Sequence, residues 1–251
     1  MNKLLTTLLA LLVASATGFA HAQSAPASAS AASSAPATAA AAANQQGGKA
    51  AASTPASLQA KIAMCLGCHN IIGYQASFPE VHKVPKIAGQ SAGYIEAALN
   101  AYKGGDRKHP TMRSIADALS DQDIKDIAAY YSKLGQEGGS AAPAKPNNEP
   151  SPQVAKLLKD AACVSCHGAN FSTPVAPNYP KVAGQYKDYL FVALKAYKTE
   201  NNAAVGRNNA IMGGIAKQFS NDQLKALADY IGGLEGDLKT VPESRFHGKE
   251  H

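Results

Sequence analysis

The sequence of 251 residues has no tryptophan and only four cysteines and four methionines. Apolar residues make up 45% of the chain, which is enough to bury one large core or two small ones. A strong excess of one charge is also missing, because 24 basic residues face 18 acidic residues for a net charge of +6. A net charge this small does not favour nucleic acid as a partner.

The N-terminal residues predict an export signal. Lys3 precedes an apolar run from Leu4 to Val13, and a small-x-small sequence ends at Ala22. This order is typical of a signal peptide over residues 1–22 that is cleaved before Gln23. The alternative is an uncleaved membrane anchor, but the run contains two threonines and falls short of the roughly 20 residues that a spanning helix needs. We therefore expect the mature protein outside the cytoplasm.

Two stretches have the composition of linkers. Residues 23–57 are mostly alanine, serine, proline and threonine, which offer too little apolar surface to offset the entropy of ordering. Residues 135–151 are rich in glycine, proline and asparagine. We predict a flexible tether at 23–57 and a linker at 135–151. The remaining chain then consists of domains at 58–134 and 152–235, followed by a C-terminal tail at 236–251.

The two predicted domains are copies of each other. Four landmarks occur in the same order in both: Cys-x-x-Cys-His, Pro-Lys-x-Ala-Gly-Gln, Met-x-x-Ile-Ala and a helix with an acidic or amide cap. The landmarks begin at Cys65, Pro85, Met112 and Ser120 in the first copy and at Cys163, Pro180, Met212 and Ser220 in the second. A tandem duplication explains this repetition.

Each copy has the periodicity of helices. Apolar residues at helical spacing precede the first cysteine of each copy, and a central helix is expected over Tyr94–Tyr102 and over Tyr189–Tyr197. The closing helices begin at Ser120 and Ser220, each followed three residues later by a side chain that completes a capping box. We find no alternating strand pattern, so the expected fold class is all-α. Units of about eighty residues have small apolar cores and usually need a covalent cross-link or a cofactor for stability.

The cysteine motifs allow three interpretations. One zinc ion held by all four cysteines is disfavoured, because the pairs are 98 residues apart in separate repeats. A redox-active dithiol leaves the histidine after each pair unexplained. Covalent haem explains every position, since both thiols of a motif add to the porphyrin and the adjacent histidine binds the iron. The attachment residues are Cys65, Cys68, Cys163 and Cys166, and the proximal ligands are His69 and His167.

An electron-carrying haem needs a sixth ligand, which is commonly methionine. Met112 follows His69 by 43 residues and Met212 follows His167 by 45, at matched positions of the repeat. His109 competes with Met112 in the first copy only. Three further histidines, His82, His247 and His251, are expected on the surface.

The quoted motifs resemble those of the di-haem class I cytochromes c of the cytochrome c4 family, over about residues 58–134 and 152–234. The resemblance implies two tandem class I cytochrome c domains, each a small helical unit wrapped around a covalently attached haem c. It also implies a periplasmic carrier whose proximal histidines donate to the carbonyls of Pro85 and Pro180. We expect the protein to be a monomer. The sequence departs from the family at Asn70, where the second copy has Gly168, and in a longer loop before Pro85.

With histidine and methionine on its two sides, the iron has no open position, so we expect outer-sphere transfer of one electron and no enzyme activity. The resemblance implies delivery of electrons to a terminal oxidase in a membrane. A cytochrome subunit of a periplasmic dehydrogenase complex is the alternative. A di-haem peroxidase is a further alternative, but it needs one iron that peroxide can reach.

Overall fold

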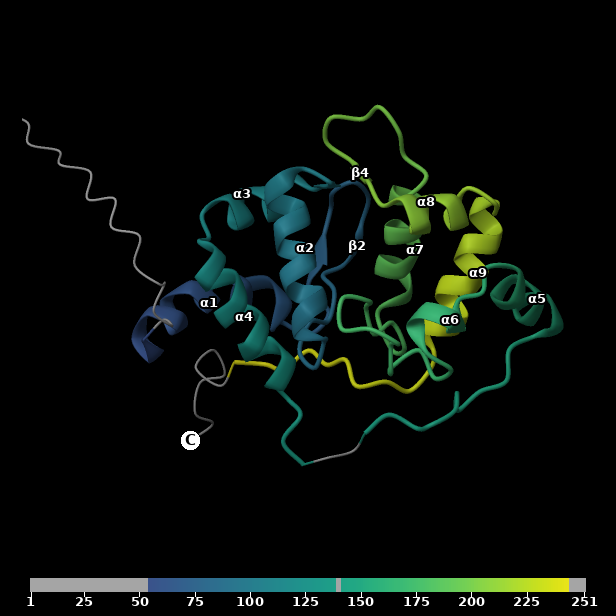
Figure 1. The fold of residues 1–251 in the computed structure, drawn as a ribbon, viewed down its shortest axis with the longest axis horizontal. Coiled ribbons are helices and arrows are strands. Elements are labelled where there is room, and N and C mark those ends of the chain that lie inside the picture. The colour runs from purple at the N-terminus through teal and green to yellow at the C-terminus, as the bar shows by residue number, and fades with distance from the viewer. Residues whose placement is uncertain (1–53, 139–140, 244–251) are drawn as a thin grey trace, which may run out of the picture. The chain divides into compact units, whose positions relative to one another are not determined.

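The described part of the chain is mainly helical (Figure 1). The computed structural model describes residues 54–138 and 141–243, which lie within one compact unit that runs from Gly48 to His251. The predicted signal peptide and the predicted tether up to residue 53 lie outside the described residues, as do His247 and His251. Among the helices that the structure describes, none is both long enough and apolar enough to cross a membrane.

Both repeats contain the predicted N-terminal, central and closing helices. The first repeat has the elements α1 (Pro55–His69), β1 (Gln75–Ala76), β2 (His82–Lys83), α2 (Ala92–Gly104), β3 (Arg107–Lys108), α3 (Pro110–Asp117) and α4 (Asp121–Lys133). The second has α5 (Pro152–Asp160), α6 (Val164–His167), α7 (Lys187–Ala196), β4 (Gly206–Arg207), α8 (Ala210–Ala216) and α9 (Asn221–Gly232). The short helices α3 and α8 were not predicted, and they carry the two candidate methionines.

Local capping explains where the principal helices begin. Ser120 and Asp123 form a reciprocal capping box at the start of α4, and Ser220 and Gln223 form the same box at the start of α9, as predicted. Helix α1 begins earlier than expected, inside the stretch predicted as tether, because the Thr54 side chain accepts a hydrogen bond from the third residue of the helix.

Each repeat has its own apolar core. In the first, α2 packs against α3 and α4, and Tyr131 and Ile124 are fully buried between the helices. In the second, α7 and α5 pack against α9, with Leu224 and Leu227 at the centre. Phe171 lies in a smaller cluster with Ala183 and Leu234. These cores are small, as expected for units of this length.

The described residues include four strands of two residues each, which the sequence did not predict. Strands β1 and β2 pair antiparallel in the longer loop of the first repeat. Strands β3 and β4 pair antiparallel across the two repeats, with Arg107 opposite Arg207. A strand of two residues is too short for an alternating pattern, so its sequence has no detectable signal.

The linker and the C-terminal segment are packed against the repeats. The Tyr230 hydroxyl donates to the carbonyl of Asn148 in the linker (3.0 Å). Beyond α9 the chain returns to the first repeat, where the Lys239 amide donates to the Ala88 carbonyl (3.0 Å) and Leu238 is 4% exposed. The described part of the predicted tail therefore joins the two repeats.

The expectation that His82 lies on the surface was wrong. Its side chain is 4% exposed, and its Nδ1 atom is 2.8 Å from the carbonyl oxygen of Glu80. The ring lies 6.1 Å from that of Tyr189 on α7. Packing of the second repeat against strand β2 covers this histidine, and no local pattern in the sequence reveals such packing.

Candidate haem-binding sites

The first Cys-x-x-Cys-His motif forms the end of helix α1. Cys65, Cys68 and His69 are half-buried in its last two turns, and both cysteines are free thiols. Burial, with a smaller effect from Cys68, raises the pKa of Cys65 to about 11. A thiol that stays protonated at neutral pH is a poor nucleophile for disulfide exchange.

The second motif has a different backbone. Helix α5 ends before Cys163, Ala162 adopts a left-handed conformation with φ of 49°, and Cys166 and His167 lie on the short helix α6. Burial likewise raises the pKa of Cys163 to about 11. The motif is therefore presented at the end of a helix in both repeats, although only the first helix is continuous.

Both histidines donate to a proline carbonyl at the position that the sequence predicts. Nδ1 of His69 is 2.8 Å from the carbonyl oxygen of Pro85, and Nδ1 of His167 is 2.9 Å from that of Pro180. A carbonyl only accepts, so each Nδ1 carries the proton and each Nε2 keeps its lone pair. Burial also lowers the pKa of both histidines, which favours neutral imidazole. This is the state in which imidazole binds a metal.

The two candidate methionines occupy the same position of matched helices. Met112 is the third residue of α3 and Met212 is the third residue of α8, and both are half-buried. The backbone N–H of Met112 donates to Nδ1 of His109, and that of Met212 donates to Oδ1 of Asn209. Met112 packs against the same core cluster as Cys65. The same local structure therefore holds the methionine side chain in each of the two repeats.

The residue after the proximal histidine is Asn70 in the first copy and Gly168 in the second, and the structure gives a reason for each. The Asn70 side chain is buried, accepts from the Tyr131 hydroxyl (2.9 Å) and donates to the Val241 carbonyl (2.6 Å). Gly168 has φ of +81°, and a Cβ there would lie 2.0 Å from the carbonyl oxygen of Thr173. The first copy thus uses this position to hold the C-terminal segment, whereas the second needs glycine for a tight turn.

A pair of arginines at the contact between the repeats was not predicted as part of the site. Arg107 donates to the Tyr94 hydroxyl (3.2 Å), and Arg207 donates to the Tyr189 hydroxyl (3.0 Å). Arg107 is 8% exposed. Each arginine precedes the candidate methionine of its own copy by five residues, and this matched spacing could have revealed the pair.

Arg107 has unused hydrogen-bonding capacity for an anion. Nε of Arg107 is buried and has no hydrogen-bond partner among the described residues. Within residues 54–138 and 141–243, the ion pairs involve neither Arg107 nor Arg207. Buried guanidinium groups are normally paired with carboxylates. A ligand that carries carboxylates, as haem does, fits this position.

The donor set also fits haem better than a metal ion held by protein alone. In the described part of the chain, no three histidine, cysteine or acidic side chains converge closely enough to hold a metal ion, so the zinc interpretation lacks its site. Each repeat instead offers two free thiols, an imidazole with a free Nε2 and a matched methionine. This combination is typical of covalently attached haem.

Comparison with known proteins agrees with this assignment. The family model described as "Cytochrome c" matches residues 59–135 and, a second time, residues 153–235. Cytochrome c4 of Stutzerimonas stutzeri is 32% identical over 200 residues, which cover 73% of this chain and 90% of that protein. A protein of Stutzerimonas stutzeri strain A1501 named "Thiosulfate dehydrogenase electron acceptor" is 32% identical over 177 residues, 66% of this chain and 77% of that protein.

A solved structure shares the fold. The crystal structure of reduced recombinant cytochrome c4 from Pseudomonas stutzeri matches with a TM-score of 0.54 and 30% identity, over 73% of this chain and 100% of that chain. The predicted fold class, two tandem helical cytochrome c domains, is therefore confirmed. The chain belongs to the cytochrome c family and, within it, to the di-haem cytochromes c4.

Proposed function

We propose that this protein is a periplasmic carrier that binds two covalent haem c groups and transfers single electrons by an outer-sphere route. Membership of the cytochrome c4 family supports electron carriage. The N-terminal sequence supports export, because it has the order of a cleaved signal peptide. The proposed acceptor is a terminal oxidase in the membrane, and the protein acts as a monomer.

The residues proposed to hold the haems are the same in both repeats. Thioether bonds form at the four cysteines, His69 and Met112 ligate one iron, and His167 and Met212 ligate the other. Arg107 and Arg207 hold propionate carboxylates at the contact between the repeats. When bound, each haem supplies a one-electron couple, which a methionine ligand shifts toward the ferrous state.

The matched placement of these histidines and methionines in the two repeats is the observation that supports this proposal. Each histidine is oriented by a proline carbonyl, and each methionine sits at the third position of a capped helix. A haem held by one of these histidines and its matched methionine would offer a substrate no open coordination position. Transfer then needs only close approach of a partner, through a small and salt-dependent interface.

Measurements of carbon monoxide binding and of electron exchange together test the proposed carrier function. In the ferrous holo-protein at neutral pH, carbon monoxide should bind poorly and peroxidase turnover should be negligible, because entry must break a bond to a thioether held by α3 or α8. Electron exchange with a small redox protein should stay fast. Rapid, stoichiometric carbon monoxide binding at one haem of the native protein would instead support the peroxidase alternative.

A second candidate function is supported by a specific relative. The protein named as a thiosulfate dehydrogenase electron acceptor is 32% identical, so we also propose a dehydrogenase as the electron donor. Stable assembly with that enzyme would make this chain a subunit rather than a free carrier. Size-exclusion chromatography of the exported protein from its native host distinguishes the two, since a free carrier elutes as a monomer.

A further inference from the structure

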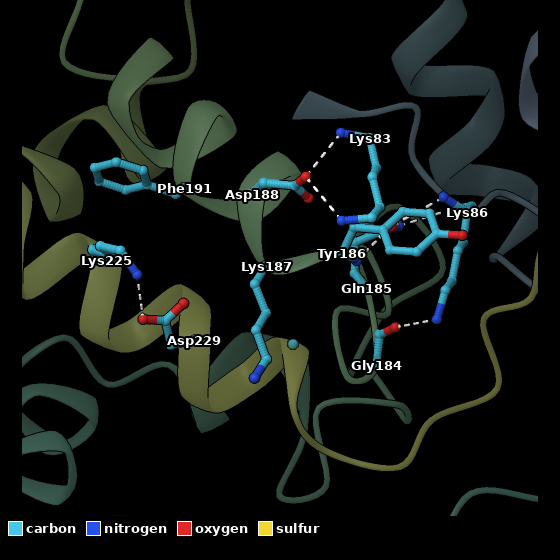
Figure 2. A pocket seen from close by; sticks show the side chains of 11 residues that line it. Lys83, Lys86, Gly184, Gln185, Tyr186, Lys187, Asp188, Phe191, Lys225 and Asp229 are labelled. Carbon is cyan, nitrogen blue, oxygen red and sulfur yellow. Dashed lines mark hydrogen bonds and ion pairs between the residues drawn. The ribbon is translucent and has the colours of Figure 1, made fainter. Parts of the chain in front are cut away.

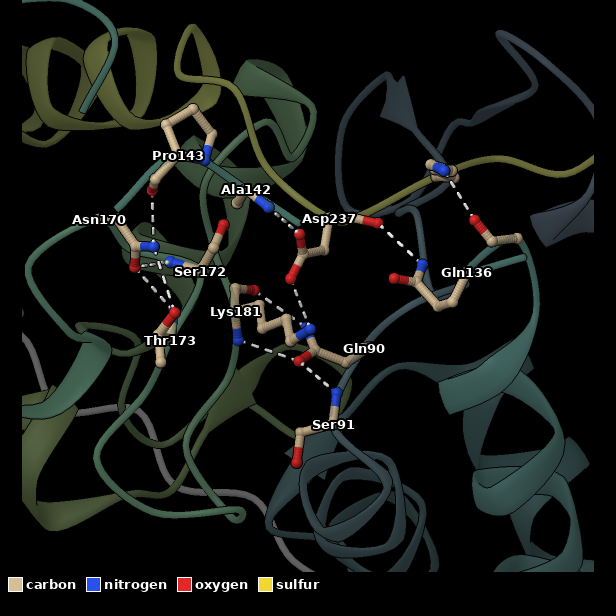
Figure 3. Close-up of polar contacts among 12 residues, drawn as sticks. Gln90, Ser91, Gln136, Ala142, Pro143, Asn170, Ser172, Thr173, Lys181 and Asp237 are labelled. Atoms are coloured by element: carbon tan, nitrogen blue, oxygen red, sulfur yellow. Dashed lines mark hydrogen bonds and ion pairs between the residues drawn. The ribbon is translucent and has the colours of Figure 1, made fainter. Parts of the chain in front are cut away.

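The duplicated Pro-Lys-x-Ala-Gly-Gln motifs bind each other reciprocally across the two repeats. Gln185 accepts from the backbone N–H of Lys86 (2.9 Å) and donates to the Lys86 carbonyl (2.8 Å) (Figure 2). Gln90 makes the same two bonds with the backbone of Lys181, both at 2.9 Å (Figure 3). The two glutamines are 4–5% exposed. Each repeat therefore inserts one amide side chain against the backbone of the other.

The backbone bound by each glutamine is also the backbone bound by a proximal histidine. The carbonyl of Pro85 and the N–H of Lys86 belong to one peptide group. His69 donates to the carbonyl side of this group, and Gln185 accepts from its N–H side. In the second repeat, His167 and Gln90 bind the two sides of the Pro180–Lys181 peptide group in the same way.

We propose that Gln185 tunes the reduction potential of the haem at His69, and that Gln90 tunes the potential of the haem at His167. Both act as positioning residues through the intervening peptide group of the other repeat. The inference rests on the proposed function, in which the two histidines are iron ligands. It makes the contact between the repeats part of what sets each potential.

The direction of the effect follows from hydrogen-bond cooperativity. An acceptor on the peptide N–H polarises the group and makes its carbonyl a stronger acceptor. The histidine Nδ1–H then donates more strongly, which makes the imidazole a more basic ligand. A more basic ligand favours ferric iron and lowers the potential. Gln185 therefore keeps the reduction potential of the haem at His69 lower than it would be if His69 and Met112 set that potential without Gln185.

The glutamines are held rigidly enough to act in this way. The Gln185 oxygen also accepts from the N–H of Tyr186 (3.0 Å), and the Gln90 oxygen accepts from the N–H of Ser91 (2.9 Å). The Lys181 side chain forms an ion pair with Asp237 beside Gln90 (2.7 Å; Figure 3). Each amide oxygen is thus fixed by two backbone donors, one from its own repeat and one from the other.

Substitution of one glutamine tests the proposal in the holo-protein. Gln185→Leu should raise the potential at His69 by about 28 mV, which corresponds to about a threefold shift in the ferric-to-ferrous ratio at 59 mV per tenfold. The potential at His167 should change less. Gln90→Leu is the matched variant and should give the reverse pattern. Potentials are followed site by site in NMR spectra at successive applied potentials, and Met112→His identifies the first site.

A purely structural role predicts a different outcome. Loosening of the contact admits water, which stabilises the more highly charged ferric state and lowers potentials. Gln185→Met, whose side chain is close to glutamine in size, serves if the leucine variant does not fold. Its thioether is only a weak acceptor for the Lys86 N–H, so the potential at His69 should rise, and rise more than that at His167.

The outcomes separate this inference from the proposed function. If the unmutated protein titrates as two haems with methionine ligands but Gln185→Leu lowers the potential at His69 or leaves it unchanged, the tuning role is wrong and the carrier stands. Equal shifts at both sites would also overturn the tuning role. If the unmutated protein lacks methionine-ligated haem, both proposals fail.

Discussion

Nδ1 of His109 accepts a hydrogen bond from the backbone N–H of Met112 at 3.3 Å, so this histidine caps helix α3. Asn209 occupies the same position before α8 and accepts from Met212 at 2.9 Å. The two copies therefore use different side chains for one task. This shared role favours Met112 over His109 as the candidate ligand, because a neutral His109 that accepts at Nδ1 carries its proton on Nε2 and has no lone pair free for iron.

His109→Asn should leave the first haem site intact. Asparagine is among the best N-cap residues, so we expect the free energy of unfolding to change by less than about 1 kcal/mol. The optical charge-transfer band between methionine sulfur and iron should keep its full intensity for two haems. A band that has only half of this intensity already in the unmutated protein, together with a large change in one potential in the variant, would instead show that His109 binds the iron.

Met112→His should leave the first haem attached through its cysteines but lower its potential. Imidazole favours ferric iron more than a thioether does, and axial ligands set potentials over a range of about 0.8 V. We expect a fall of roughly 0.1 V or more at this site, measured by redox titration. Met212→His is the matched control and should affect the second site. An unchanged titration in the Met112 variant would exclude this methionine as a ligand.

Local motifs account for the features that the sequence predicts well. A capping box such as that of Ser120 and Asp123 is encoded within four residues, and the helix it starts has a clear apolar face. The cysteine motif is equally local. The proline carbonyls lie in a matched loop 13 or 16 residues after their histidines, so the family resemblance was enough to identify them.

The contacts between the repeats were not predictable in the same way. The pairs Gln185 with Lys86 and Gln90 with Lys181 join residues that are more than 90 positions apart. Nothing in either hexapeptide indicates that it binds its own copy. His82 was misassigned for a related reason, since its burial depends on packing by the second repeat rather than on neighbours in sequence.

Gly168→Ala should destabilise the second repeat strongly. The residue has a positive φ, and an added Cβ would meet the Thr173 carbonyl oxygen at 2.0 Å, so the turn after His167 must move. We expect a loss of about 2 kcal/mol or more in the free energy of unfolding, measured by urea denaturation. Gly104→Ala is the control, because a Cβ there meets no atom within 4 Å. Similar losses in both variants would contradict the steric explanation.

Asn70→Ala should loosen the C-terminal segment from the first repeat. The substitution leaves the buried Tyr131 hydroxyl without its acceptor and the Val241 carbonyl without its donor. An unsatisfied buried polar group costs about 1–3 kcal/mol. Faster amide hydrogen exchange at Lys239, which pairs with Ala88, should accompany the loss. Unchanged exchange there would show that Asn70 does not hold the segment.

The caps of α4 and α9 should respond differently to acid, because one uses a carboxylate and the other an amide. Hydrogen bonds from the backbone N–H and the hydroxyl of Ser120, with a contribution from Lys61, lower the pKa of Asp123 below its usual value near 4. A carboxylate with a lowered pKa stabilises the fold above its unfolded pKa, and this stability is lost as pH falls through the lower, folded pKa. Gln223 does not titrate.

Exchanging the two caps tests this difference directly. In Asp123→Gln, the pH-dependent stabilisation from this cap should disappear, with a change of about 1 kcal/mol or less at neutral pH. The difference in urea midpoint between this variant and the unmutated protein should therefore shift as the pH is lowered from 7 to about 3. Gln223→Asp should add a dependence of the same sign to the second repeat, since the Ser220 backbone N–H donates to the side chain at 223 as that of Ser120 donates to Asp123. Midpoint profiles that stay parallel across this pH range in both variants would show that the charge of Asp123 contributes nothing to the cap, and that its geometry alone supports α4.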